Sequence, residues 1–511
     1  MGLGRRPLLR AVSGGVVAGA LATTGQARSQ ASYAPMGSLG VDGAADAVVD
    51  DDGETVYLAT GDGFATVDIA DPSSPTLLAE VTGIGEEFTN GPLRSILDVA
   101  VAGDELLVSG PAQRGTFRGL VVYDVSDPTA PEPATEFVRT GHSIHNADFD
   151  GEYAYLTNNL PSDRPLSMYD VTATNEDGER APEQVGRWSP LQYDADVDGW
   201  SEMGLFPGTI HDVTVHDGVA YCCYWDGGTW MVDVSDPANP SYLGRVGDYP
   251  LERLVELATD LEEGDSAEFR QLFGEAPGND HYAAVNEDAT VLAVGGEAWD
   301  DPTTPGGGPA DLDLYDISDP ANPEQVATVE PEDATDTTRG GTWTTAHNFD
   351  IHGDRLYTSW YDAGVKVHDI SDPANPERLA WWLRPEEARF WTAQVATPGE
   401  TFVASSYGID GRRSALYVFP DREGEQADRP SLLGEQGTTT VRTTTTQSAT
   451  GTTETTATET TETTTATTTE SGSGSGSGSE SEAEETPGFG VLAALGGLGY
   501  GAYRYLRRGE E

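Results

Sequence analysis

The sequence is poor in cysteine, and this shortage excludes several classes of protein. Only two cysteines occur, the adjacent Cys222 and Cys223. Neighbouring side chains of a strand point to opposite faces, so a disulfide between them would have poor geometry. The chain has no Cys-x-x-Cys motif and no zinc-ribbon spacing. We therefore interpret the pair as two small apolar side chains in a buried strand.

Basic residues are also scarce. The 511 residues include 28 Lys and Arg against 86 Asp and Glu, which gives a formal net charge of −58, and Lys366 is the single lysine. Such self-repulsion destabilises a compact chain, but at 1 M salt the Debye length is only about 3 Å. The composition therefore favours a halophilic source. It argues against nucleic acid as a partner, because phosphate contacts need Lys and Arg.

Common catalytic signatures are missing as well. The sequence contains no His-Glu-x-x-His, no Gly-x-Ser-x-Gly and no Gly-x-x-x-x-Gly-Lys phosphate loop. This argues against an enzyme of these classes. It leaves open a site that is assembled from residues far apart in the sequence.

A short segment, Asp-[Ile/Val]-[Ala/Ser]-Asp-Pro-x-x-Pro, occurs five times and follows a strand-like apolar run each time. The copies begin at Asp68, Asp124, Asp233, Asp316 and Asp369. A repeat of roughly 50 residues indicates a propeller or solenoid. Between 32 and 420 the alternation predicts seven units of four strands; in the sixth unit these lie at 347–352, 355–360, 364–370 and 377–382. We predict an all-β fold, a β-propeller of seven blades, with six or eight as alternatives.

The repeated segment itself is interpreted as a turn. Proline fixes φ, and Asp and Ser side chains accept hydrogen bonds from nearby backbone N–H groups. The segments resemble the LVIVD repeat of bacterial and archaeal surface proteins. This resemblance implies a propeller over 32–421, and it implies no particular activity.

Four of the eight histidines occupy equivalent positions at the start of the first strand of a unit: His145, His211, His281 and His347. In a propeller this register places them around the mouth of one central channel. Neutral imidazoles there suit a transition metal such as Cu or Zn. The arrangement is similar in outline to selenium-binding/methanethiol oxidase propellers, whose channel histidines are associated with copper. The alternative is that the His-Asn and His-Asp pairs lock neighbouring blades together.

A second candidate site is a partial calcium loop. Its candidate ligands are Asp194, Asp196, Asp198, Trp200 and Glu202. The Asp-x-Asp-x-Asp-Gly pattern matches the first half of an EF-hand loop. The twelfth position is Leu205 in place of the bidentate Glu, so any calcium site is incomplete.

Loops after the second strands carry aromatic residues beside carboxylates: Trp225, Asp226, Trp299, Asp300, Trp360, Tyr361 and Asp362. These side chains suit a carbohydrate, a peptide or a cationic ligand, and they equally suit packing at the rim. Apolar residues at helical spacing predict a helical insertion at 250–278.

The two ends of the chain are predicted to lie outside the domain. Residues 1–31 resemble a twin-arginine (Tat) export signal. The Thr-, Ser-, Gly- and Glu-rich stretch 422–486 is predicted to be a disordered stalk. Residues 487–506 resemble the Pro-Gly-Phe sorting signal of archaeal surface proteins and include a short transmembrane helix. The resemblance implies that an archaeosortase removes the helix, and the alternative is a retained membrane helix; residues 507–511 are a charged tail.

Together these features predict a propeller that is exported by Tat and anchored at its C-terminus on the extracellular face of the membrane. Its expected role is to bind an extracellular protein, glycan or small ligand. The alternatives are a metal-dependent surface enzyme of the copper type and a structural component of the envelope.

Overall fold

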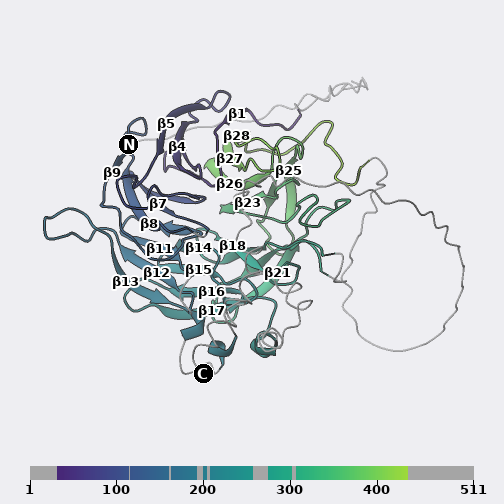
Figure 1. Cartoon of the computed structure of the whole chain (residues 1–511). Coiled ribbons are helices and arrows are strands. Elements are labelled where there is room, and N and C mark those ends of the chain that lie inside the picture. The colour runs from purple at the N-terminus through teal and green to yellow at the C-terminus, as the bar shows by residue number, and fades with distance from the viewer. Residues whose placement is uncertain are drawn as a thin grey trace, which may run out of the picture.

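Seven sheets follow one another along the chain and surround a central axis (Figure 1). The computed structural model describes residues 32–113, 115–159, 163–192, 199–203, 208–256, 274–301 and 307–434. Each sheet contains four strands in an antiparallel meander, and one sheet gains a short fifth strand. The predicted all-β propeller with seven four-stranded blades is confirmed.

The first three blades are β2 (Ala47–Val49) to β5 (Thr76–Thr82), β6 (Val99–Ala102) to β9 (Glu132–Pro133), and β10 (Ala147–Phe149) to β13 (Glu183–Trp188). Their middle strands are β3 (Thr55–Ala59), β4 (Gly63–Asp68), β7 (Glu105–Gly110), β8 (Gly119–Asp124), β11 (Tyr153–Thr157) and β12 (Leu166–Asp170). Two short 3-10 helices, Pro190–Gln192 and Trp200–Glu202, follow the third blade.

The next three blades are β14 (Val213–His216) to β17 (Ser241–Val246), β18 (Asp280–Val285) to β21 (Glu324–Val329), and β22 (Phe349–His352) to β25 (Glu377–Trp382). Their middle strands are β15 (Val219–Cys223), β16 (Thr229–Asp233), β19 (Val291–Gly296), β20 (Leu312–Asp316), β23 (Arg355–Ser359) and β24 (Val365–Asp369). Cys222 and Cys223 are buried and free, as their sequence context predicted.

The seventh blade joins the two ends of the domain. It consists of β26 (Phe390–Thr397), β27 (Thr401–Ser406), β28 (Ala415–Pro420) and the N-terminal strand β1 (Gly37–Gly40). Strand β1 pairs antiparallel with β28, with Gly37 opposite Val418 and Gly40 opposite Ala415. Every inner strand also contacts the inner strands of both neighbouring blades. The ring is therefore closed, which leaves no open edge along the inner strands.

Buried apolar residues fill the spaces between neighbouring blades. One cluster joins the second and third blades through Leu107, Val122 and Phe149, and another joins the fourth and fifth blades through Tyr221 and Leu292. The core is thus a set of layers between sheets, and each layer depends on the correct stacking of two repeats.

The repeated Asp-Pro segment forms the turn that its sequence predicted. The side chain of Asp124 accepts hydrogen bonds from the backbone N and the hydroxyl of Ser126, at 2.9 and 2.6 Å. The Asp127 side chain accepts the same two hydrogen bonds, from the backbone N and the hydroxyl of Thr129. The other complete copies bond their own backbone in the same way.

These turns also hold neighbouring blades together. The turn carbonyl of Pro237 lies against Gly186 in the outer strand of the preceding blade, and a Cβ on Gly186 would lie 1.7 Å from that oxygen. Pro320 lies against Gly244 in the same way, also at 1.7 Å. Glycine is therefore required at these two outer-strand positions because a backbone from the next blade approaches too closely for any side chain.

The end of the domain differs from the prediction. The predicted stalk begins at 422, but residues up to 434 are described and pack on the sixth blade. Strand β29 (Gly424–Glu425) pairs parallel with β25, and the Gln426 amide bonds both the N and the O of Leu383, at 3.0 and 3.1 Å. Leu432 packs beside the cluster between the fifth and sixth blades. The sequence does not reveal this because the segment is polar and binds mainly through backbone groups.

Part of the predicted helical insertion lies within the described residues. Residues 251–256 are helical, and Leu254 is fully buried against the cluster that contains Trp200 and Trp230. The Tat-type signal, most of the stalk and the sorting signal lie outside the described residues. Within the described part of the chain, no helix is long and apolar enough to cross a membrane.

Replacement of Gly244 by alanine should separate two blades. The new Cβ would collide with the Pro320 carbonyl, so we expect a loss of about 1–3 kcal/mol in the free energy of unfolding, measured by denaturant titration at constant high salt. Gly340→Ala is the matched control, because Gly340 is exposed and a Cβ there meets nothing closer than 3.9 Å. Equal stability of the two variants would contradict this packing role.

The buried carboxyl of Asp46 should make stability depend on pH. Its oxygen accepts hydrogen bonds from the Thr392 hydroxyl and the Asn348 amide, and burial raises its pKa to about 6. A raised pKa means that the folded state favours the protonated acid. The Asp46 carboxyl therefore contributes to the stability of the folded state below about pH 4, and this contribution is lost as pH rises through 6. Between pH 4 and pH 7, the free energy of unfolding of Asp46→Asn should therefore rise by about 2–3 kcal/mol relative to that of the wild type. A pH-independent difference would contradict this.

Candidate metal centre at the channel mouth

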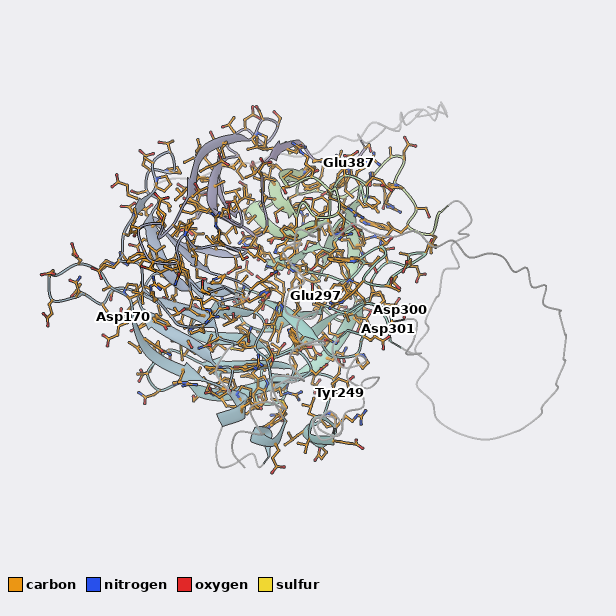
Figure 2. All side chains as sticks on the ribbon, in the orientation of Figure 1. Asp170, Tyr249, Glu297, Asp300, Asp301 and Glu387 are labelled. Atoms are coloured by element: carbon orange, nitrogen blue, oxygen red, sulfur yellow. The ribbon has the colours of Figure 1, made fainter. Side chains whose placement is uncertain are left out.

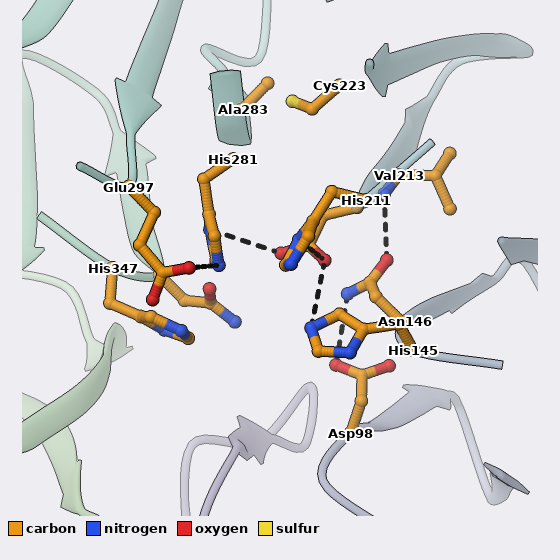
Figure 3. A network of polar contacts seen from close by, with 12 residues as sticks. Asp98, His145, Asn146, His211, Val213, Cys223, His281, Ala283, Glu297 and His347 are labelled. Atoms are coloured by element: carbon orange, nitrogen blue, oxygen red, sulfur yellow. Dashed lines mark hydrogen bonds and ion pairs between the residues drawn. The ribbon is translucent and has the colours of Figure 1, made fainter. Parts of the chain in front are cut away.

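The four predicted histidines lie side by side at one end of the channel (Figure 3). His145, His211 and His347 each lie two residues before an inner strand, and His281 is the second residue of β18. Successive ring centroids are 4.1 Å apart for His145 and His211, 4.3 Å for His211 and His281, and 4.4 Å for His281 and His347. Ring closure thus brings together four side chains that are far apart in the sequence.

Two groups of three potential ligands occur here. The ligand atoms of His145, His211 and His281 lie within 4.8 Å of one another, and so do those of His281, Glu297 and His347. Among the described residues, no other group of three or more His, Cys, Asp or Glu side chains lies this close together. Figure 2 labels Glu297 near the middle of the ring, whereas Asp170 lies toward its outer edge.

Three of the four rings are oriented by a hydrogen bond to Nδ1. The Nδ1 atom of His347 lies 2.8 Å from the Trp391 carbonyl oxygen, that of His211 2.9 Å from Asp212 Oδ1, and that of His145 3.4 Å from the Ala112 carbonyl oxygen. These oxygens accept, so Nδ1 carries the proton in each ring and Nε2 keeps its lone pair. A fixed tautomer of this kind is typical of histidine ligands in metal sites.

The environment keeps the imidazoles neutral. Burial lowers the pKa of His145 and of His211 to about 4, and for His145 the neighbouring His211 adds to the shift. Burial also lowers the pKa of His281 and His347 well below the usual range. Neutral imidazole is the metal-binding form, so all four rings are in that form at neutral pH.

The carboxylate of the His-Asp pair, Asp212, lies among three of the rings. Besides its contact with His211, the Asp212 side chain has Oδ1 at 4.0 Å from His145 Nε2 and Oδ2 at 3.5 Å from His281 Nδ1. Burial raises its pKa to about 7. Glu297 is the second such residue, with Oε2 at 3.8 Å from His281 Nε2. Asp212 belongs to the His-Asp pair that the sequence indicated, whereas no sequence signal distinguishes Glu297 among the 86 acidic residues.

The alternative role, locking blades together, is carried by two of the imidazoles and by the asparagine that follows each of them. Nδ1 of His145 bonds the Ala112 carbonyl of the second blade, and Nδ1 of His347 bonds the Trp391 carbonyl of the seventh blade. The Asn146 amide donates to Asp98 Oδ1 of the second blade at 3.2 Å, and its Oδ1 accepts from Val213 N of the fourth blade at 2.8 Å. Asn348 and Thr392 both reach Asp46 of the first blade. In both His-Asn pairs the Asn side chain and the imidazole Nδ1 therefore join blades, which leaves the imidazole Nε2 to face the channel mouth.

The aromatic loop residues are mostly buried. Among the seven predicted residues, Trp299, Trp360, Tyr361, Asp226 and Asp362 are at most 2% exposed, and Trp225 is 8% exposed. Asp300 is half-buried. This burial favours packing at the rim over the predicted ligand-binding face. Tyr361 still contributes to the centre, because its hydroxyl donates to Glu297 and its ring lies 4.9 Å from that of His347.

Asp362 has a structural partner that explains its burial. The Arg389 guanidinium donates to both of its oxygens, at 3.0 and 2.8 Å, and stacks over Trp343. Arg389 is 1% exposed and Asp362 is fully buried. The two residues form a buried ion pair between the sixth and seventh blades.

The predicted calcium loop is only partly described. Asp194, Asp196 and Asp198 lie outside the described residues. Trp200 packs against Trp230, with ring centroids 4.7 Å apart, and its carbonyl oxygen accepts a bond from Met203 N. Glu202 is exposed. The calcium site therefore stays a prediction.

Comparison with known proteins supports the fold. The model of the LVIVD repeat family matches residues 49–82, 115–136 and 207–248. The chain is thus a seven-bladed β-propeller that contains LVIVD repeats. No curated protein matched the sequence.

Similar solved structures include U3-55K, the β-propeller domain of Cps50 (Swd1) from Myceliophteria thermophila, and the WD40 repeats of RRP9. Each is 10% identical to the chain with a TM-score of 0.49, over 76% of this chain and 98 or 99% of the other.

The Arg389–Asp362 pair offers a test of the packing role. Arg389→Leu leaves a carboxylate buried without its main partner, so we expect a loss of roughly 3–5 kcal/mol in stability. Replacing both residues by leucine should recover a large part of this loss, because no buried charge remains. A double variant as unstable as the single one, measured by thermal unfolding, would contradict this explanation.

Proposed function

We propose that this chain is an exported, surface-anchored propeller whose channel mouth binds a transition metal, and that a small extracellular ligand binds at this metal. The observation that carries the proposal is the convergence of His145, His211 and His281, whose ligand atoms lie within 4.8 Å of one another. Two of these rings are oriented through Nδ1. Neutral imidazoles with Nδ1 held by an acceptor keep Nε2 available as a metal ligand.

The ligand type narrows the choice of metal. Nitrogen donors with a few carboxylates suit Zn²⁺ or copper and do not suit Ca²⁺ or Mg²⁺, which prefer oxygen. Three protein ligands leave a coordination position for water or another small ligand. Such an ion supplies Lewis-acid chemistry if it is zinc, and electron transfer as well if it is copper. The centre therefore also supports the metal-enzyme alternative.

Access to the centre comes from the channel mouth. The His145 side chain is 19% exposed, whereas that of His281 is 2% exposed. A ligand would therefore approach from the His145 side and meet the deeper rings afterwards. Trp225 contacts His211, the ring next to His145, so the ligand would be small and partly apolar.

The sequence of the two ends supports the location. The Tat-like leader and the Pro-Gly-Phe-type C-terminal segment are typical of a protein that is exported and then anchored outside the cell. A Thr-rich stalk would hold the propeller away from the membrane. The high acidity suits concentrated salt and disfavours nucleic acid as a partner.

Metal loading tests the proposal directly. The full-length protein, purified in concentrated salt and stripped with a chelator, is titrated with Zn²⁺ or Cu²⁺ and its bound metal is measured by mass spectrometry. We expect binding that weakens at least 10- to 100-fold in His211→Asn. The control is His352→Asn, which alters a half-exposed histidine at the other end of β22.

Two results would contradict the proposal. One is wild-type protein that binds no metal after reloading. The other is equal affinity in His211→Asn and His352→Asn, which would place the bound metal elsewhere. Circular dichroism of both variants shows whether the propeller is intact.

A further inference from the structure

We infer that the channel mouth holds two metal ions, and that His281 bridges them through its two ring nitrogens. This inference rests on the proposed metal binding and specifies how many ions the centre takes and how they are connected. Its starting point is that the two groups of potential ligands share one residue. His281 belongs to the group with His145 and His211, and also to the group with Glu297 and His347.

His281 differs from the other three histidines in its hydrogen bonds. His145, His211 and His347 each place Nδ1 against an acceptor oxygen, which leaves one nitrogen per ring for a metal. The Nδ1 atom of His281 is buried and makes no hydrogen bond, and its contact with the Asp212 carboxylate is long, at 3.5 Å to Oδ2. Because a buried nitrogen without a hydrogen bond is costly, its retention points to a ligand that the bare protein lacks.

The two nitrogens of His281 face different groups. Nδ1 lies 3.5 Å from Asp212 Oδ2, on the side of His211 and His145. Nε2 lies 3.8 Å from Glu297 Oε2, on the side of His347. Figure 3 shows the His281 ring between these two sets, with Glu297 and His347 on one side and His211 and His145 on the other.

The first ion would therefore be held by His145, His211 and His281 Nδ1. The second would be held by His281 Nε2, Glu297 and His347. Each set has three protein ligands and leaves a position open, as zinc and copper sites with bound water do. The lining is rich in nitrogen, so the expected pair consists of zinc, copper or one of each.

Charge and proton balance are consistent with such a pair. A ring that binds through both nitrogens carries no N–H, so binding of the second ion releases the His281 ring proton to solvent. The bridging imidazolate, Glu297 and the adjacent Asp212 then offset part of the positive charge of the two ions. Without these anions, two divalent ions in a buried site would repel each other strongly.

A pair of ions also narrows the class of ligand. Because the imidazolate ring stands between the two ions, a single atom is too small to bridge them. A ligand that binds both ions must offer two donor atoms, as a carboxylate or an oxyanion does. The Tyr361 hydroxyl, which donates to Glu297, lies beside the second ion's ligands and orients that carboxylate. Tyr361 is thus a positioning residue.

The test uses full-length protein stripped of metal and titrated with Cu²⁺ in concentrated salt. We expect about two Cu²⁺ ions per chain. The electron paramagnetic resonance signal should lose intensity as the second ion binds, because spins bridged by one imidazolate couple to each other. His145→Asn and His347→Asn should each retain about one ion with an uncoupled signal, and His352→Asn should behave like the wild type.

The His281→Asn variant separates the bridge from simple proximity. It removes a ligand from both sets, so we expect weaker binding of both ions and no spin coupling at any loading. If this variant does not fold, the two single variants above still decide the matter. Coupling that persists in folded His281→Asn would contradict the bridge.

The outcomes distinguish this inference from the proposed function. A single ion per chain in the wild type, lost entirely in His145→Asn, would overturn the two-ion centre and leave the metal-binding function intact. No bound ion at all would overturn both. Two ions that are unaffected by His145→Asn and His347→Asn would place the metal elsewhere and also overturn both.

Discussion

Closure of seven sheets into one ring is the constraint on which the rest of the structure depends. It places the start of every inner strand around a common axis, so residues in equivalent positions of different repeats become neighbours. His145 and His347 are about 200 residues apart in the sequence, yet they belong to one continuous row of four imidazoles. The repeat thus provides the proximity that a catalytic or metal site needs, without any local sequence motif.

Two sets of interactions hold the ring together, one near its outer edge and one near its axis. Near the outside, Asp-Pro turns press against glycines of the preceding blade, as at Gly186 and Gly244. Near the axis, Asp98, Asn146 and Asp46 join blades through side-chain bonds to neighbouring strands. Because Asn146 and Asn348 directly follow His145 and His347, their bonds to Asp98 and Asp46 also fix the backbone from which these two imidazoles project. Stability and the geometry of the centre therefore share the same residues.

The sequence predicted the strands well because each repeat carries strong turn chemistry. In the sixth blade the predicted strands at 347–352 and 377–382 agree with β22 and β25 to within two residues. The register of the histidines was predictable for the same reason. The burial of Trp299, Trp360 and Asp362 could not be predicted. An aromatic residue in a loop gives the same sequence pattern whether it packs against the protein or binds a ligand. Glu297 was hidden by the abundance of acidic residues, and the docking of 422–434 by its polar composition.

Anomalous X-ray scattering from crystals of the protein soaked with Zn²⁺ or Cu²⁺ would show whether the four imidazoles form a metal centre. We expect anomalous peaks at about 2.0–2.1 Å from imidazole nitrogens at the channel mouth, one beside His145 and His211 and one beside Glu297 and His347. Rings bonded only to ordered water, with no anomalous density at the mouth, would contradict this expectation.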